Sequence, residues 1–206
     1  MTTKVLQESA SQTAGPYLHI GMMPAAAGLE RRRNQPGNVL ARAGALGERI
    51  RIEGVVYDGE GCVVRDAMIE IWQANAEGKY DHPDDPQQKA VDPNFNGFGR
   101  AVSDFGTGLW WFDTIKPGVV PGRHKRPMAP HVNVLVFARG VNVGLQTRLY
   151  FSDEAAANAA DPVINLIELA PRRETLVAQR SERDGQVVYR FDIHLQGDRE
   201  TVFFDI

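Results

Sequence analysis

The sequence is poor in cysteine and has no long hydrophobic run. Its 206 residues include one cysteine, Cys62. An internal disulfide is therefore impossible, and because no neighbouring histidine supports a reactive role, we interpret this thiol as incidental. The longest apolar runs, such as residues 132–138, are too short to span a bilayer, and residues 1–20 lack the apolar segment of a signal peptide. We expect a cytoplasmic protein.

An excess of basic residues is also missing. Lys and Arg number 23 against 26 Asp and Glu, which gives a net charge of −3. No overall positive field is available to attract nucleic acid or an anionic membrane. The sequence has no glycine-rich phosphate loop between a strand and a helix, no Cys-x-x-Cys motif, and no spacing that suggests a Ser-His-Asp triad. These absences argue against nucleic-acid-binding, nucleotide-binding and protease functions.

A β pattern begins near residue 49 and continues to the C-terminus. Apolar and polar residues alternate between turn signals such as DGEG, which is typical of paired strands. The segments predicted as strands are 49–58, 63–75, 99–103, 109–115, 131–139, 146–151 and 186–195. Only residues 152–180 have a helical pattern, which includes Asp161 and Pro162 as a helix start. We predict an all-β fold, mainly an antiparallel β-sandwich, with a short helical excursion around residues 152–180.

The first 49 residues differ from the rest of the chain. Prolines and glycines interrupt them and no periodicity is evident, so we interpret residues 1–49 as an N-terminal arm and residues 50–206 as one sandwich domain. Residues 11–19 nonetheless contain packing groups, and composition alone favours docking on the chain's own domain over other surfaces. In the segment LWWFDT, either Trp110 or Trp111 must face away from the core, and an inter-subunit contact would explain it.

A proline-broken loop, residues 114–130, leads to His131 at the start of an apolar strand. Residues two apart in a strand share a face, so residue 133 could complete a His-x-His metal pair. Residue 133 is asparagine, whose amide is a poor ligand for a transition metal. A lone histidine at this place is more often structural. The polar loop 76–99 contains Tyr80 and His82, and we interpret its acidic turn as solvated rather than metal-binding.

Motifs throughout the chain resemble the intradiol ring-cleaving dioxygenases. They are SQTAGPY, IEIWQAN, DPNFNGFGR, TIKPG, APHVNV, FARG, RLYF and ETVFFDI. In that family two tyrosines and two histidines hold a ferric ion, and the resemblance places Tyr80, Val120, His131 and Asn133 at the ligand positions. Since Val120 and Asn133 are not such ligands, these four positions, the vestigial site, are expected to bind no metal, and no catalytic residue is expected in this chain.

Within the family the chain is similar to non-iron alpha subunits that pair with a homologous beta subunit carrying Fe(3+). The resemblance implies an enzyme that cleaves 3,4-dihydroxybenzoate (protocatechuate) with O₂ to 3-carboxy-cis,cis-muconate, in aromatic catabolism by the beta-ketoadipate pathway. It also implies that the arm packs on the partner subunit, and that alpha–beta pairs form a higher-order assembly.

The resemblance further implies that this chain contributes to the wall of the partner's substrate pocket. The residues concerned are Thr13, Gly15, Pro16, Tyr17 and Arg139. Arg139 ends an apolar strand, where its guanidinium could reach a cleft and bind a carboxylate. Two alternatives remain open from sequence. One is a structural subunit that only stabilises the assembly, and the other is a self-sufficient catechol-type enzyme that uses Tyr80 and His131 with other ligands.

Overall fold

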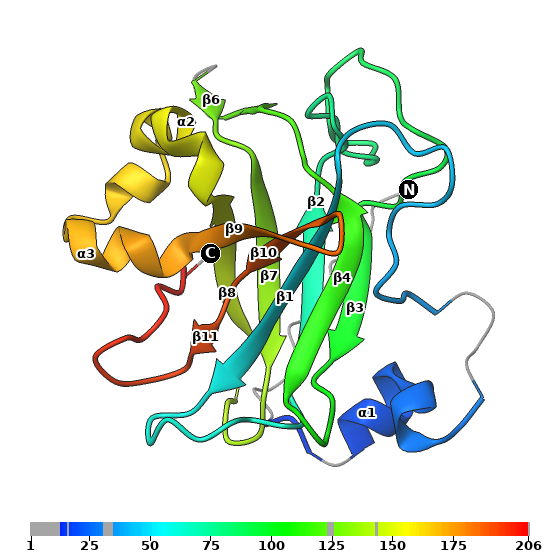
Figure 1. Ribbon diagram of the computed structural model, residues 1–206, viewed down its shortest axis with the longest axis vertical. Coiled ribbons are helices and arrows are strands. Elements are labelled where there is room, and N and C mark those ends of the chain that lie inside the picture. The colour runs from blue at the N-terminus through cyan, green and yellow to red at the C-terminus, as the bar shows by residue number, and fades with distance from the viewer. Residues whose placement is uncertain (1–12, 16, 31–34, 123–125, 143, 206) are drawn as a thin grey trace, which may run out of the picture.

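The computed structural model describes residues 13–15, 17–30, 35–122, 126–142 and 144–205 (Figure 1). Its strands are β1 (Arg49–Tyr57), β2 (Met68–Gln73), β3 (Phe98–Val102), β4 (Leu109–Ile115), β5 (Val120–Pro121), β6 (Pro127–Met128), β7 (His131–Phe137), β8 (Leu145–Phe151), β9 (Val177–Arg183), β10 (Gln186–Arg190) and β11 (Ile193–His194). Each segment predicted as a strand overlaps at least one of these strands, and the mainly β fold is confirmed.

Short helical segments lie before β1 and between β8 and β9. They are α1 (Tyr17–Met22), η1 (Pro24–Ala27), η3 (Ser152–Glu154), α2 (Ala155–Ala160), η4 (Ile164–Leu166), α3 (Ala170–Arg173) and η5 (Glu174–Leu176). The predicted helical excursion is therefore too long at its end, because residues 177–180 belong to β9. Val177 and Ala178 pair with the end of β8, and this tertiary pairing overrides the local helical pattern.

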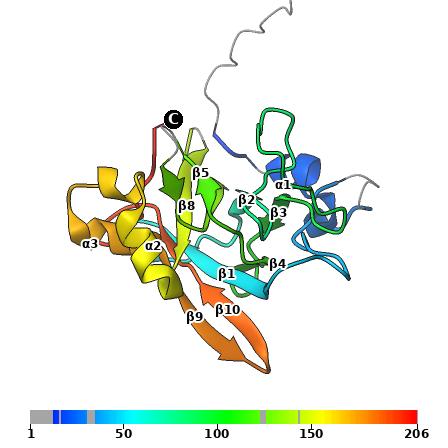
Figure 2. The same ribbon diagram turned by 90° about the horizontal axis from the view of Figure 1, so that it is seen from above.

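The strands form two layers joined along one edge. One layer has the order β4–β1–β10–β9 and the other has the order β3–β2–β7–β8, with a short parallel pairing between β8 and β9. The predicted sandwich is confirmed, and most pairs are antiparallel as expected. The pairs β1–β10, β1–β11 and β8–β9 are parallel, so the sheet as a whole is mixed. Figure 2 shows α2 and α3 on one side of the sandwich and α1 on the other.

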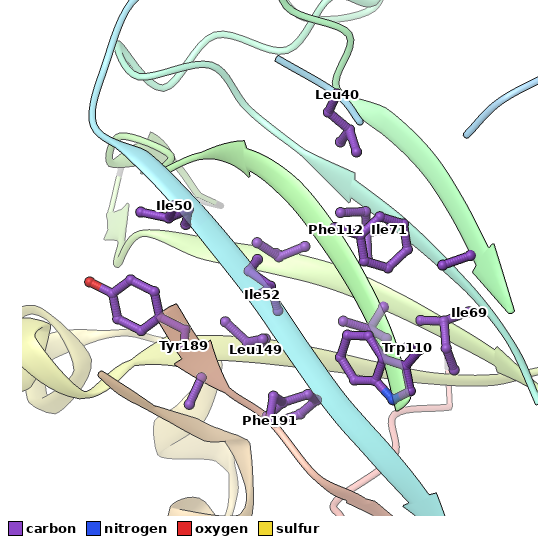
Figure 3. Packing of buried hydrophobic residues seen from close by; sticks show 14 of the residues in the cluster. Leu40, Ile50, Ile52, Ile69, Ile71, Trp110, Phe112, Leu149, Tyr189 and Phe191 are labelled. Carbon is purple, nitrogen blue, oxygen red and sulfur yellow. The ribbon is translucent and has the colours of Figure 1, made fainter. Parts of the chain in front are cut away.

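The core lies between the two layers (Figure 3). Alternating residues of each strand point inwards, as the period of two in a strand requires. Ile52 of β1 and Phe112 of β4 face Ile71 of β2 and Leu149 of β8, and all four side chains are buried. The residues between them along each strand point outwards, so the outer face of the β3–β2–β7–β8 layer is available to carry polar groups.

Trp110 and Trp111 lie on opposite faces of β4, as the strand pattern predicts. Trp110 is fully buried in the core, and Trp111 is half-buried on the outside. The guanidinium carbon of Arg51 lies 4.3 Å from the centroid of the Trp111 ring, and Arg51 also pairs with Asp113 at 2.8 Å. A cation–π contact within the chain thus covers one face of Trp111. The inter-subunit contact stays a prediction.

The last part of the predicted arm packs on the chain's own domain. Leu40 and Ala41 are buried members of the core, and the Leu40 N–H donates to the Asp113 carbonyl at 2.8 Å. Residues 37–42 therefore belong to the sandwich rather than to a free arm. The boundary at residue 49 and the packing of earlier residues on a partner stay predictions. Among the described residues, no helix combines the length and apolar composition needed to cross a bilayer.

Candidate functional site

Hydrogen bonds hold Tyr80 in a fixed place within the long polar loop after β2. The side-chain oxygen of Asn75 accepts from the Lys79 N–H at 2.9 Å. The Lys79 ammonium lies 3.4 Å from the Asp85 carboxylate, both side chains being more than nine-tenths buried, and Asp85 accepts from the Tyr80 N–H at 2.9 Å. The Tyr80 ring stacks on Trp72 with 5.6 Å between ring centroids. This loop is therefore an ordered part of the site, and the buried Asp85 departs from the solvated acidic turn predicted here.

The TIKPG motif brings Val120 beside this loop. Gly118 lies so close to the loop that a β-carbon there would be 2.3 Å from the Ala76 carbonyl oxygen, so only glycine fits. Its N–H donates to the Asn75 carbonyl at 3.0 Å. Two residues later, Val120 is buried and, with Tyr80, lines a cavity of about 290 Å³. The position that the resemblance assigns to a second tyrosine ligand thus lines the same cavity as Tyr80.

His131 and Asn133 meet Tyr80 from β7. His131 is 2% exposed, and its Nδ1 lies 2.7 Å from the Ala129 carbonyl oxygen. A carbonyl oxygen only accepts, so Nδ1 carries the hydrogen and Nε2 has a lone pair, 3.5 Å from the Tyr80 hydroxyl. The side-chain NH₂ of Asn133 lies 3.4 Å from the same hydroxyl. The structure therefore brings together the four predicted ligand positions of the vestigial site.

The chemistry of this set does not fit a ferric ion. Val120 has no donor atom, and Asn133 offers a neutral amide. Burial raises the pKa of Tyr80, and burial together with the positive charge of Arg148 lowers the pKa of His131 to about 4. One neutral imidazole and one protonated phenol are too few and too weak to hold Fe(3+). In the described parts of the chain, no three His, Cys, Asp or Glu side chains form a metal-binding group. The histidine of the polar loop, His82, is exposed.

Arg148 also belongs to the vestigial site, although sequence reasoning missed it. It lies on β8 directly opposite Asn133 in the strand register, and its Nε donates to the Asn133 side-chain oxygen at 3.1 Å. Trp72 of β2 pairs with Asn133 on the other side. These three side chains form one row across the outer face of the sheet. Alternation in QTRLYF could have placed Arg148 on an outer face of the sheet. The strand register that sets it beside Asn133 could not be predicted from the sequence.

Arg139 lies in the turn two residues after the end of β7, so the predicted strand 131–139 is too long at its end. The six steps along β7, at about 3.3 Å each, separate His131 from this end of the strand by roughly 20 Å. The Arg139 side chain is 72% exposed, and its Nε forms an ion pair with Asp66. The Gly140 N–H donates to the Thr13 hydroxyl oxygen at 3.1 Å. In Figure 1 the start of the described arm, α1 and the β7–β8 turn lie together at the end of the sandwich away from β5 and β6.

The remaining predicted pocket residues lie in or beside the same arm. Gly15 accepts a hydrogen bond from the Leu18 N–H at 3.1 Å. Tyr17 begins α1 and is 79% exposed, and Pro16 lies outside the described residues. The predicted residues thus form two groups, with Thr13 and Arg139 at one end of the sandwich and the vestigial site at the other. Their role in a substrate pocket stays a prediction.

Comparison with known proteins places the chain in a family. A family model described as Dioxygenase matches residues 29–197. The chain is 52% identical over 205 residues to the protocatechuate 3,4-dioxygenase alpha chain of Pseudomonas putida, covering 100% of both chains. It belongs to the intradiol dioxygenase family. The resemblance carried by the sequence motifs is confirmed, and the broken ligand set lies in a true intradiol dioxygenase fold.

This chain is also similar to a beta chain and to a solved member of the family. It is 37% identical over 166 residues to the protocatechuate 3,4-dioxygenase beta chain of Burkholderia cepacia, covering 78% of this chain and 69% of that one. The solved intradiol ring-cleavage dioxygenase from Tetranychus urticae has the same fold, with a TM-score of 0.60 at 17% identity over 92% of this chain and 94% of that one. Alpha and beta chains are therefore homologous to this chain, and hence to each other.

Proposed function

We propose that this chain is the non-iron alpha subunit of a protocatechuate 3,4-dioxygenase, and that a homologous beta subunit carries the Fe(3+). One observation supports the proposal: Tyr80 lies beside His131 and Asn133 and lines a cavity with Val120, yet Val120 and Asn133 cannot replace a tyrosinate and an imidazole. Similarity to an alpha chain over the full length supports the same assignment.

The proposed enzyme inserts both atoms of O₂ into 3,4-dihydroxybenzoate between its two hydroxyl-bearing carbons and gives 3-carboxy-cis,cis-muconate. The iron chemistry belongs to the partner. At the pocket wall this chain binds and orients the substrate and excludes water. Arg139 suits that role because its side chain is exposed while its Nε is paired with Asp66. A guanidinium has five N–H donors, so its terminal nitrogens can bind the substrate's carboxylate while Asp66 holds the side chain in place.

The arm supplies the rest of the wall in this proposal. Thr13, Gly15, Pro16 and Tyr17 reach the partner's site. Residues 1–49 pack on the partner, except where residues 37–42 join the sandwich formed by residues 50–206. The high exposure of Tyr17 supports this arrangement, because a large aromatic side chain left in water is typical of a surface that another molecule covers. The pairs of alpha and beta subunits join into a larger assembly in the cytoplasm.

Two tests separate the proposal from its alternatives. A structural subunit that touches no substrate predicts unchanged kinetics when Arg139 becomes alanine, whereas the proposed pocket role predicts weaker use of the anionic substrate. A self-sufficient enzyme predicts iron and ring cleavage in this chain by itself. Iron analysis and an activity assay of the chain without any partner therefore decide between the proposal and the second alternative.

A further inference from the structure

We propose that Arg148 is a resident cation of the vestigial site, whose guanidinium takes the place of the metal's positive charge and keeps metal ions out. The inference rests on the part of the proposed function that places iron on the partner alone. It goes further in naming a third side chain, besides those at positions 120 and 133, that prevents metal binding. Replacing the two absent ligands is then not sufficient to restore the site.

Arg148 is connected to the vestigial site through Asn133. It faces Asn133 across the β7–β8 pair and bonds to its side-chain oxygen at 3.1 Å, while the Asn133 NH₂ group points to the Tyr80 hydroxyl at 3.4 Å. Asn133 thus links the guanidinium to one of the two remaining donors. An imidazole introduced at position 133 would lie against a fixed positive charge.

Among the described residues Arg148 forms no ion pair, although Asp205 lines one of the same cavities. Asp161 is a buried carboxylate close to His131. It accepts hydrogen bonds from the Tyr150 hydroxyl at 3.1 Å and from backbone N–H groups, among them that of Ala129 at 2.8 Å.

The charge of Arg148 opposes the binding of a metal ion at the vestigial site. A divalent or trivalent ion between Tyr80 and His131 would be repelled by the guanidinium in a half-buried place, where screening by water is weak. The guanidinium of an arginine is a permanent positive charge in proteins, so this repulsion persists. Removing the charge, rather than only adding ligands, is therefore required for tight metal binding.

Cavities around positions 120 and 148 can accommodate the side chains needed to test this role. A tyrosine at position 120 can extend into the cavity of about 290 Å³ that Val120 and Tyr80 line. Arg148 itself borders cavities of about 370 and 720 Å³ on the outer face, so a shorter neutral side chain creates no clash. The variants are Val120→Tyr with Asn133→His, and the same pair with Arg148→Gln, Arg148→Met or Arg148→Lys. Arg148→Lys keeps the charge and is the matched control.

The measurement is iron content by elemental analysis, together with the visible tyrosinate-to-iron absorption, after exposure to Fe(2+) in air. Each full-length variant is purified in complex with its partner, and iron in excess of the unaltered complex is counted. We expect little excess iron in the double variant and in the Arg148→Lys control, and about tenfold more in the Arg148→Gln and Arg148→Met variants. Circular dichroism and retention of the partner confirm folding, and two different neutral residues guard against one misfolded variant.

Two results would overturn the role of Arg148. In the first, the double variant takes up as much iron as the variants with a neutral residue at 148. In the second, folded Arg148→Gln and Arg148→Met variants take up no more iron than the lysine control. Failure of the proposed function looks different, because the unaltered chain without its partner would then already carry iron and cleave substrate.

Discussion

The hydroxyl oxygen of Thr13 accepts a hydrogen bond from the backbone N–H of Gly140, 127 residues later in the chain, at 3.1 Å. This contact fastens the start of the described arm to the turn that carries Arg139, which is itself paired with Asp66. Two residues predicted to line the partner's pocket are therefore fixed at one end of the sandwich, far from the vestigial site at the other. A single surface can present both to a neighbouring subunit.

Replacing Arg139 by alanine in the alpha–beta enzyme should weaken its action on 3,4-dihydroxybenzoate. A charge-assisted hydrogen bond contributes roughly 1.5 to 3 kcal/mol, so kcat/KM should fall about tenfold to hundredfold. Iron content should not change. Arg190→Ala is the matched control, because Arg190 is also ion-paired, to Asp192 at 2.7 Å, but lies on β10 of the other layer. Steady-state kinetics that match the unaltered enzyme would remove Arg139 from the pocket.

Replacing Thr13 by valine should loosen the arm while preserving its shape. The change removes the acceptor of the Gly140 N–H, and a hydrogen bond of this kind is worth about 1 kcal/mol. We expect kcat/KM to fall about fivefold, and the arm to be cut faster by proteases. Thr13→Ser keeps the hydroxyl and should behave as the unaltered chain. Equal kinetics and proteolysis in the valine and serine variants would show that this contact does not position the arm.

The strands could be predicted from the sequence because alternation is a local property. Leu109–Ile115 was predicted to the residue, and the TIKPG and APHVNV motifs located three of the four vestigial positions. Strand register and long-range pairing are not local, and the errors lie there. The pairing of Val177 with β8 ended the helical segment early. The Arg148–Asn133 contact and the Arg139–Asp66 pair likewise join residues whose partners no periodicity identifies.

The buried imidazole of His131 should make stability depend on pH in a defined range. Burial lowers its pKa to about 4 in the folded chain, against about 6.5 when unfolded. Between these values the unfolded chain binds a proton that the folded chain does not, so the free energy of unfolding should fall as pH falls from 6.5 towards 4. Stability from this group is thus complete above pH 6.5. The total loss corresponds to about 3 kcal/mol.

Denaturant unfolding at a series of pH values checks this, with His131→Gln as the comparison. The glutamine variant is less stable at pH 7, because it loses the bond to the Ala129 carbonyl, but its stability should change less between pH 6.5 and 4. Parallel pH profiles for the two proteins would mean that His131 has the same pKa in the folded and the unfolded chain, contrary to the predicted effect of burial.

Lys116 should stabilise the junction between β4 and the helical segment. Its ammonium lies 2.8 Å from Asp153 and 2.7 Å from Glu154, and the Tyr189 hydroxyl donates to Asp153 at 2.9 Å. Lys116→Met leaves two carboxylates without their cation and should lower stability by roughly 1 to 3 kcal/mol, seen as a lower Tm. Lys116→Arg keeps the charge and should lose much less. Equal melting temperatures for the methionine and arginine variants would contradict the importance of the charge.

The most direct test of the central claim is the iron content and activity of this full-length chain, purified without a second subunit. We predict a colourless protein with almost no iron that does not cleave 3,4-dihydroxybenzoate, and that supports cleavage when combined with an iron-bearing beta subunit. Stoichiometric iron, with ring cleavage by the chain alone, would contradict the account and establish a self-sufficient enzyme.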